Sequence, residues 1–565
     1  MRLSIASGPK ACMRACNPIL LLTASTMALP SAALAQTCED VASGDGIRSL
    51  VVTAQDEVFD HADFSFGRTL GQIIETAGAV DTPAERIAMV QSLVRSFNRT
   101  QFENPDSSLP VPVEVRPEAS LDPVRLLDSA DLQEGMHPVG LFNRFDLADA
   151  AFEDCGEHRI VYALGDGQRL DHRMTLIFEA AVPNPAPGLG EAGCLPIVRF
   201  WKGLETVSDP AELASRLDAF YYGGLDLDQD GTADLVPVVH SDHFGLKGGQ
   251  VRGNMFVVDG DFNFPWQLRE WLVGRNVDTS PTLTVETIKD TPQEQFYSDI
   301  DDPLSDFADF QRRFQQEFVS LNLINLMRPE INGKINGTTP SATEIIAGFS
   351  AGFADQYNDF QSIAGNPAGD SPDEPRTQLD ASGNKSFKPR IEDQLLIFDL
   401  PGVPTVTHIA NRAGAMACGG CHQFSNNEPI APPLPGQTED LRWPTSLISP
   451  GPGFVHIDEQ GELSPALKDH FLVARCTRID GYLAKHEAEP ALAAESLVAE
   501  IKGAMPELMQ VQTVKDVVQA QQNFMAAQTQ EQRSIALSNL EAAVKIDRSR
   551  REQTPGAFYE VRRTH

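Results

Sequence analysis

Apolar residues recur at helical spacing in several parts of the chain. Between residues 84 and 97 they fall at every third or fourth position, which predicts an amphipathic helix capped by Asp81 or Thr82. The same spacing predicts helices over residues 210–220, 307–327 and 404–417, and over much of the chain from residue 464 onward. The aromatic stripe within 307–327 indicates packing in a core rather than a cradle for a cofactor.

Shorter apolar runs, separated by Gly and Asp, predict β-strands in the middle of the chain. They lie at residues 159–164, 174–180, 195–200, 236–240 and 254–258, and a later one lies at 394–400. Their spacing indicates a largely antiparallel sheet, and Trp201, Trp266 and Trp271 are expected to pack at its edges. The expected fold class is therefore α+β, with a mixed or antiparallel sheet in the N-terminal region and a mainly helical C-terminal part.

Changes in composition divide the 565 residues into five segments. Residues 1–35 are expected to be a signal peptide, and 36–135 a region of helices and loops. Residues 136–363 are expected to form an α+β domain, 364–392 a linker or long loop, and 393–565 a mainly helical region.

The N-terminal segment has the three parts of a secretory signal peptide. Arg2, Lys10 and Arg14 precede a mostly apolar run that ends in Ala33-Leu34-Ala35, an A-x-A cleavage site. A membrane anchor is the alternative, but the run is short and contains Ser, Thr and Pro. No later run of about 18 apolar residues follows, so we expect no membrane span after cleavage and a periplasmic or extracellular location.

The chain is strongly acidic, with 79 Asp and Glu against 45 Lys and Arg and a net charge of −34. This charge argues against nucleic acid and anionic membrane surfaces as partners. It suits a soluble protein, or one that docks to a basic partner.

The motif with the clearest chemistry is Cys418-Gly419-Gly420-Cys421-His422. In this C-x-x-C-H pattern the thiols of Cys418 and Cys421 can attach a haem covalently, and His422 can bind its iron as proximal ligand. A short disulfide, a redox pair or half of a zinc site are the alternatives. Candidates for the sixth iron position are His456, His470, Met505 and Met509.

Six cysteines remain after the expected cleavage, and two of them belong to this motif. The other four can form two disulfides in an oxidising compartment. Our prediction is Cys155–Cys194 with Cys38–Cys476, although four cysteines allow three pairings.

Residues 226–234 contain much of a calcium-binding loop. Asp226, Asp228, Asp230, Thr232 (through its carbonyl) and Asp234 stand at the positions of the first ligands, and Gly231 permits the bend. Pro237 replaces the closing glutamate, so the loop is not a complete EF-hand. It is similar to the shortened Asp-rich calcium loops of extracellular repeat proteins, and an acidic turn without calcium is the alternative.

A second cluster, His240, Asp242 and His243, could ligate a transition metal or serve a hydrolase, but it lacks a distant third ligand.

Several strings together resemble a family of large exported bacterial proteins with a single C-x-x-C-H motif. They are PVGLFNRFD at 138–146, CGEHRIVY at 155–162, GQVRGN at 249–254, WQLRE at 266–270, the cysteine motif itself, and FVHI at 454–457. The resemblance implies a shared architecture and haem attachment at Cys418, Cys421 and His422, but no particular reaction. We therefore expect an exported haem-c-binding protein with a one-electron redox role and a protein redox partner. The alternative is a non-enzymatic exported binding or surface protein, with a Cys418–Cys421 disulfide and calcium on the Asp-rich loop.

Overall fold

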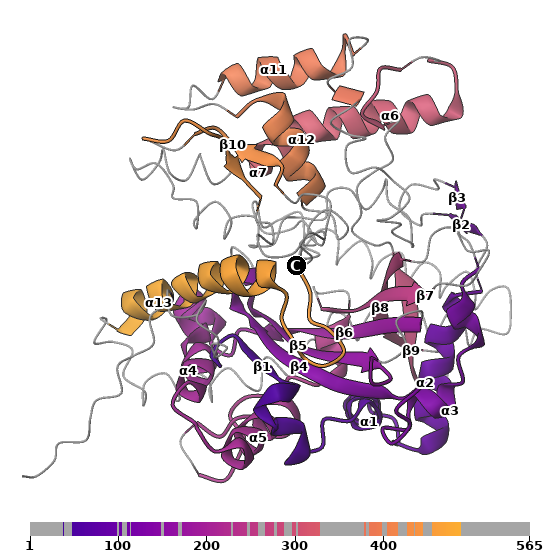
Figure 1. The fold of residues 1–565 in the computed structure, drawn as a ribbon, viewed down its shortest axis with the longest axis vertical. Coiled ribbons are helices and arrows are strands. Elements are labelled where there is room, and N and C mark those ends of the chain that lie inside the picture. The colour runs from indigo at the N-terminus through magenta and orange to yellow at the C-terminus, as the bar shows by residue number, and fades with distance from the viewer. Residues whose placement is uncertain are drawn as a thin grey trace, which may run out of the picture. The chain divides into compact units, whose positions relative to one another are not determined.

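The computed structural model describes a defined set of residues: 38, 48–98, 101–103, 110–112, 115–148, 152–167, 172–227, 230–245, 249–257, 266–275, 280–286, 296–300, 303–327, 378–379, 384–397, 404–415, 427–433, 436–443 and 455–487. The chain divides into two units, Met1–Thr37 and Cys38–His565, and all of these residues belong to the second. The fold class is α+β, as the sequence predicts (Figure 1). Within the ranges given, none of the helices has the length and apolar character needed to cross a membrane.

The centre of the fold is a seven-stranded antiparallel sheet in the order β1-β4-β5-β6-β7-β8-β9 (Figure 1). The strands are β1 (Val51–Thr53), β4 (Met136–Arg144), β5 (Asp154–Leu164), β6 (His172–Pro183), β7 (Gln250–Val257), β8 (Trp266–Arg275) and β9 (Pro281–Glu286). From β4 onward each strand pairs with the next one along the chain. The predicted strands at 159–164 and 174–180 are confirmed as parts of β5 and β6, and the one at 254–258 is confirmed as part of β7 up to Val257, since Val258 lies outside the described residues.

One face of the sheet forms the apolar core with α1 (Phe66–Thr76) and α2 (Pro83–Ser96). The ring of Phe66 lies 5.4 Å from that of Tyr162 and 6.0 Å from that of Phe178, measured between centroids. Phe97, which follows α2, contacts Trp271 of β8 edge to face, with 5.9 Å between the ring centroids. Because side chains alternate along a strand, this packing leaves the intervening residues of the same strands on the opposite face.

The helix predicted over residues 84–97 is confirmed as α2. Thr82 is its N-cap, and the Thr82 hydroxyl accepts a hydrogen bond from the backbone N–H of Glu85 at 3.2 Å. Asp81, the other capping candidate, forms an ion pair with Arg86 instead. The predicted helix at 210–220 is confirmed as α5 (Pro210–Asp218) and the helical turn after it.

The strand predicted at 195–200 is wrong, because these residues form α4 (Leu195–Leu204). Pro196 stands in its first turn, where a missing backbone N–H costs nothing. Trp201, expected at an edge of the sheet, lies on this helix and stacks on His158 of β5 with ring planes 11° apart. Trp271 lies one strand in from the edge strand β9, and the side chain of Trp266 is not among those described.

Two other predicted strands are also wrong. The segment at 236–240 is not a strand of the sheet, because the backbone N–H groups of Val238 and Val239 donate to the carbonyls of Phe220 and Tyr221, at the end of a helical turn. Residues 394–397 belong to α11 (Phe387–Ile397), which also includes the last residues of the predicted linker.

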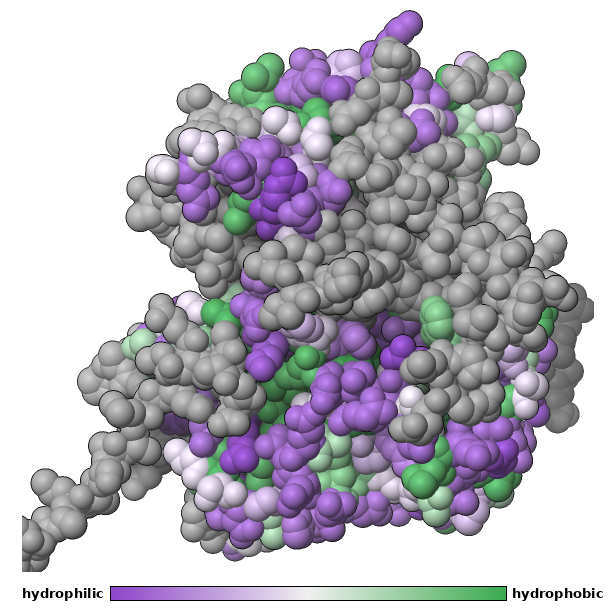
Figure 2. Space-filling view, in the orientation of Figure 1, coloured by the Kyte–Doolittle hydropathy of each residue, from purple (hydrophilic) through white to green (hydrophobic). Residues whose placement is uncertain are grey.

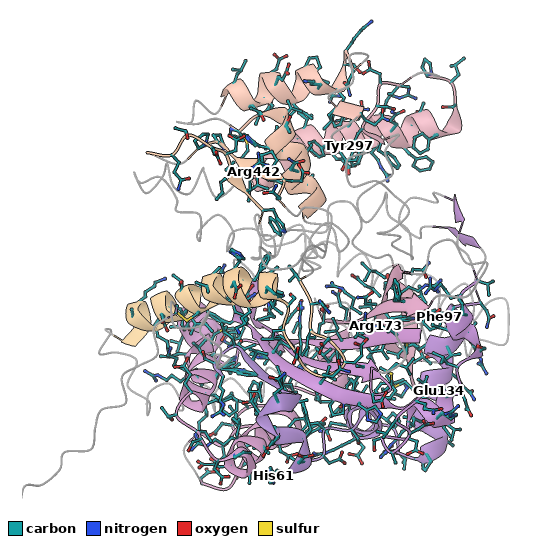
Figure 3. The ribbon with its side chains drawn as sticks, in the orientation of Figure 1. His61, Phe97, Glu134, Arg173, Tyr297 and Arg442 are labelled. Atoms are coloured by element: carbon teal, nitrogen blue, oxygen red, sulfur yellow. A yellow bond between two sulfur atoms is a disulfide. The ribbon has the colours of Figure 1, made fainter. Side chains whose placement is uncertain are left out.

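A group of helices follows the sheet in the chain: α6 (Asp306–Glu317), α7 (Leu323–Leu326), α11 and α12 (Val406–Ala415), with the short hairpin of β10 (Pro429–Ala431) and β11 (Leu441–Arg442). Its core is aromatic. Tyr297, labelled in Figure 3, lies 5.0 Å from Phe314 and 6.0 Å from Phe318 between ring centroids, and Phe387 of α11 completes the cluster. The stripe within 307–327 is therefore core, as expected.

Both predicted disulfides are present. Cys155 at the start of β5 bonds Cys194, which immediately precedes α4, and Cys38 bonds Cys476 of α13 (Leu472–Glu487). Hydrophilic residues cover most of the described surface in the view of Figure 2, in agreement with the acidic composition.

Candidate functional site

The haem-binding candidates Cys418, Cys421 and His422 lie outside the described residues. The described segments before and after them are joined by hydrogen bonds. The helix predicted at 404–417 is present as α12, which ends at Ala415. The Asn411 amide donates to the carbonyl of Pro429 at 2.8 Å. Arg412, fully buried, donates to the carbonyls of Ile430 and Leu326, the latter at 2.8 Å. The helix before the motif and the strand after it are therefore held together.

Two of the four candidates for the sixth iron position are described, His456 and His470. Burial lowers the pKa of His456, and the nearby charge of Arg173 on β6 lowers it further. Burial also lowers the pKa of His470. Both imidazoles are thus kept neutral at pH 7, which is the form that binds a metal. Met505 and Met509 lie outside the described residues.

The Asp-rich loop is held in a bend by its own carboxylates. Asp226 accepts hydrogen bonds from the backbone N–H groups of Asp230 and Gly231, at 3.1 and 2.7 Å. Gly231 has a φ of 89°, a conformation that favours glycine. Asp234 is buried and accepts from the N–H of Leu227 at 2.7 Å.

The described carboxylates of this loop, those of Asp226, Asp230 and Asp234, are not gathered around one point. Asp228 lies outside the described residues, and Thr232 donates its N–H to Asp230 at 2.9 Å. Among the residues that the structure describes, no three acidic side chains of the loop have ligand atoms within 4.8 Å of one another. The calcium site stays a prediction.

The cluster at 240–243 also does not assemble a metal site within the described residues. The ring nitrogen Nδ1 of His240 lies 3.9 Å from a carboxylate oxygen of Asp242. His243 is buried, donates from Nδ1 to the carbonyl of Val238 at 2.9 Å, and has its pKa lowered to about 4 by burial and by the charge of His240. His243 is thus a neutral core histidine.

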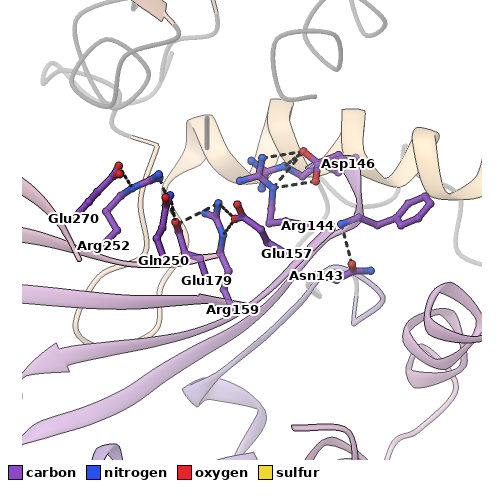
Figure 4. Close-up of polar contacts among 11 residues, drawn as sticks. Asn143, Arg144, Asp146, Glu157, Arg159, Glu179, Gln250, Arg252 and Glu270 are labelled. Atoms are coloured by element: carbon purple, nitrogen blue, oxygen red, sulfur yellow. Dashed lines mark hydrogen bonds and ion pairs between the residues drawn. The ribbon is translucent and has the colours of Figure 1, made fainter. Parts of the chain in front are cut away.

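The most elaborate polar arrangement lies elsewhere, in a row of buried charges across the sheet, on the face opposite α1 and α2 (Figure 4). We call this row the charge network. It consists of Arg144, Asp146, Glu157, Arg159, Glu179, Gln250, Arg252, Glu270 and, from α13, Arg475. Each of these residues is at most 6% exposed, so this part of the face is a charged interior rather than a solvated surface.

At the β4 end of the network, two arginines converge on one carboxylate. Arg144 makes a bidentate pair with Asp146 at 2.9 and 2.8 Å, and Arg475 of α13 lies 3.6 Å from the same carboxylate. Burial alone would raise the pKa of Asp146, but the charges of Arg144 and Arg475 and the hydrogen bonds from Arg144 lower it below its ordinary value.

In the centre of the network, carboxylates outnumber arginines. Arg159 donates to Glu157 at 2.9 Å, and its Nη2 lies 3.2 Å from Glu179. Arg252 lies 3.4 Å from Glu179 and donates to Glu270 at 3.0 Å. Among the described residues, three carboxylates therefore share these two guanidinium groups.

Glu157 accepts hydrogen bonds from the described residues through one of its two carboxylate oxygens. Its Oε2 is paired with Arg159, whereas its Oε1 accepts no hydrogen bond in the part of the chain that the structure describes. Burial raises the pKa of Glu157 to about 7; the charge of Arg159 opposes this rise, and that of Glu179 adds to it.

The sheet register explains why this network forms. Arg144 stands opposite Glu157, Arg159 opposite Glu179, and Arg252 opposite Glu270, so side chains of opposite charge share one face of neighbouring strands. A methyl group on Gly140 of β4 would lie 2.8 Å from Ile457, which places the segment around residue 457 over the same face.

Five of the six strings that suggest the family resemblance therefore meet at this face, since β4, β5, β7, β8 and the segment at 455–457 each contain one; the cysteine motif lies outside the described residues. The network residues were not among the sequence-predicted site residues. The available signal was the presence of Arg and Glu inside otherwise apolar strands.

Comparison of the chain with protein-family models, with curated proteins and with solved structures finds no match.

Proposed function

We propose that the chain is an exported haem-c-binding protein with a one-electron redox or electron-transfer role. The observation that carries this proposal is the motif Cys418-x-x-Cys421-His422 together with the state of the other cysteines. Two disulfides use Cys38, Cys476, Cys155 and Cys194. Of the six cysteines that follow the expected leader, the two in the motif remain for a porphyrin.

The side chains of the motif are suited to covalent attachment of a haem. Two thiols, two residues apart, and an adjacent imidazole are the side chains that covalent haem attachment requires. Cys418 and Cys421 would hold the porphyrin, and His422 would bind the iron. A haem bound there supplies reversible one-electron chemistry at its iron. His456 and His470, whose pKa values are lowered by burial, are the described candidates for the sixth position.

The expected compartment and partner agree with this role. Disulfides persist outside the reducing cytosol, and the predicted leader directs export. With a net charge of −34, the chain would attract a basic redox partner protein by long-range steering. The resemblance to exported proteins with a single C-x-x-C-H motif supports the same role. Calcium on the loop of Asp226, Asp228, Asp230, Thr232 and Asp234 would brace the α+β region, and it is a second, separate part of the proposal.

The test is a pyridine haemochrome spectrum of the protein, exported in a host with c-type haem maturation. We expect a c-type band that survives denaturation and disappears in C418S/C421S. The matched control is C38S/C476S, which loses two cysteines but keeps the motif and should keep the band. A colourless protein with Cys418 and Cys421 oxidised to each other would refute the proposal and favour the non-enzymatic binding protein.

A further inference from the structure

The centre of the charge network holds more negative than positive charge. Around Glu157 and Glu179 the neighbouring strands supply Arg144 from β4, Arg159 from β5 and Arg252 from β7. Arg144 is engaged in its bidentate pair with Asp146, where Arg475 of α13 adds a second cation. Arg252 is shared with Glu270 of β8.

Arg159 is left as the main cation for two buried carboxylates. Its Nη2 contacts both Glu157 and Glu179. Both glutamates are 0% exposed, so water cannot offset the remaining negative charge. The Oε2 of Glu179 accepts a hydrogen bond from Gln250 at 2.8 Å, whereas its Oε1 has two ion pairs and no hydrogen bond within the described part of the chain.

We propose that Glu157 and Glu179 form a proton-binding site, in which the two carboxylates hold one proton between them at neutral pH. A proton taken from solvent forms an O–H bond at Glu157 and gives the pair a single negative charge, which matches the single charge of Arg159. The Oε1 of Glu157 accepts no hydrogen bond from the described residues, and it is the natural place for this proton. Like charges held this close are relieved by protonation of one of them.

The pKa of about 7 for Glu157 sets the pH range of the site. Most other carboxyl groups titrate near pH 4, so few of them change state between pH 6 and pH 8. A carboxyl signal that titrates in this interval can therefore be assigned by mutation.

The experiment is infrared spectroscopy of the full chain at a series of pH values, following the C=O stretching band of a protonated carboxylic acid. We expect a band at pH 6 that is lost by pH 8, with half of the loss near pH 7. E157Q should abolish it. The matched control is E118Q, because Glu118 is equally buried but has both oxygens paired with Arg116, at 2.9 and 2.7 Å; this variant should keep the band.

A second variant keeps the proposal testable if E157Q fails to fold. E179Q removes the neighbouring negative charge, so the midpoint of the band should move to lower pH. An unchanged midpoint in E179Q, no titrating band in the folded wild type, or a band that persists in E157Q would each overturn the proposal.

Stability gives an independent readout. Between its ordinary pKa of 4.5 and the folded value of about 7, Glu157 is protonated in the folded chain and ionised in the unfolded chain. The folded state then binds more protons, so the free energy of unfolding falls as pH rises through this interval. E157Q should lose this dependence and E118Q should keep it; an equal slope in wild type and E157Q would contradict a proton at Glu157. None of these measurements requires haem, so their outcome is separate from that of the proposed function.

Discussion

Arg159 is the position where a single substitution should most damage the charge network. In R159M the side chain keeps its approximate length but loses its charge, so Glu157 and Glu179 remain buried without their main partner. Arg159 has 7% of its side chain exposed and both carboxylates have 0%. Breaking a buried ion pair by removing one partner typically costs about 3–5 kcal/mol.

We therefore expect R159M to lower the free energy of unfolding by about 3–5 kcal/mol at pH 8. The loss should be smaller at pH 6, because Glu157 can then take up a proton and the uncompensated charge is reduced. Loss of the Arg159 charge raises the pKa of Glu157 further, which acts in the same direction. Adding E157Q to R159M should recover part of the loss at pH 8.

The assay is urea-induced unfolding followed by far-UV circular dichroism at both pH values. The matched control is R216M: Arg216 pairs with Glu212 on α5, with side chains 46% and 51% exposed. An exposed pair of this kind contributes about 0.3–0.5 kcal/mol. A loss below about 1 kcal/mol for R159M at pH 8, or an equal loss at both pH values, would refute the reasoning about uncompensated buried charge.

Two further predictions concern the disulfide within the sheet domain and the Asp-rich loop. C155S/C194S opens a loop closed across 39 residues and should lower the free energy of unfolding by about 4 kcal/mol, measured by the same urea titration; an unchanged midpoint would contradict it. Calcium titrated calorimetrically into chelator-treated protein should release or absorb heat in wild type and in D242N, an exposed carboxylate outside the loop, but not in D226N/D230N. No heat and no thermal shift in wild type would remove the calcium site.

The sequence predicted the elements that have an apolar pattern of the usual kind. Helix α2 was found because its buried positions are apolar at helical spacing, and strands β5 and β6 were found because they contain short apolar runs. The segment 195–200 was misassigned because a short, mostly apolar run fits either a strand or a helix. Val198, Trp201 and Leu204 are buried three residues apart, which is the spacing of a helix. This spacing becomes visible only when the segment is extended to residue 204.

The charge network could not be predicted because charged residues in a strand are usually exposed to solvent, whereas these are buried. Charged side chains in a strand usually indicate a solvated face, yet Arg269 and Glu270 of β8 are both buried, one on each side of the sheet. The network residues come from elements far apart in the sequence, so no local spacing links Glu157 with Arg252 or Asp146 with Arg475. The sequence did suggest that these strings belong together, but only strand register shows what they form.

The Cys38–Cys476 bond has a mechanical consequence. It closes a covalent ring that spans 438 residues and includes every strand of the sheet. A force that pulls the chain before Cys38 away from the chain after α13 passes through the two sulfur atoms, and the strands between them bear no tension until a reductant opens the ring.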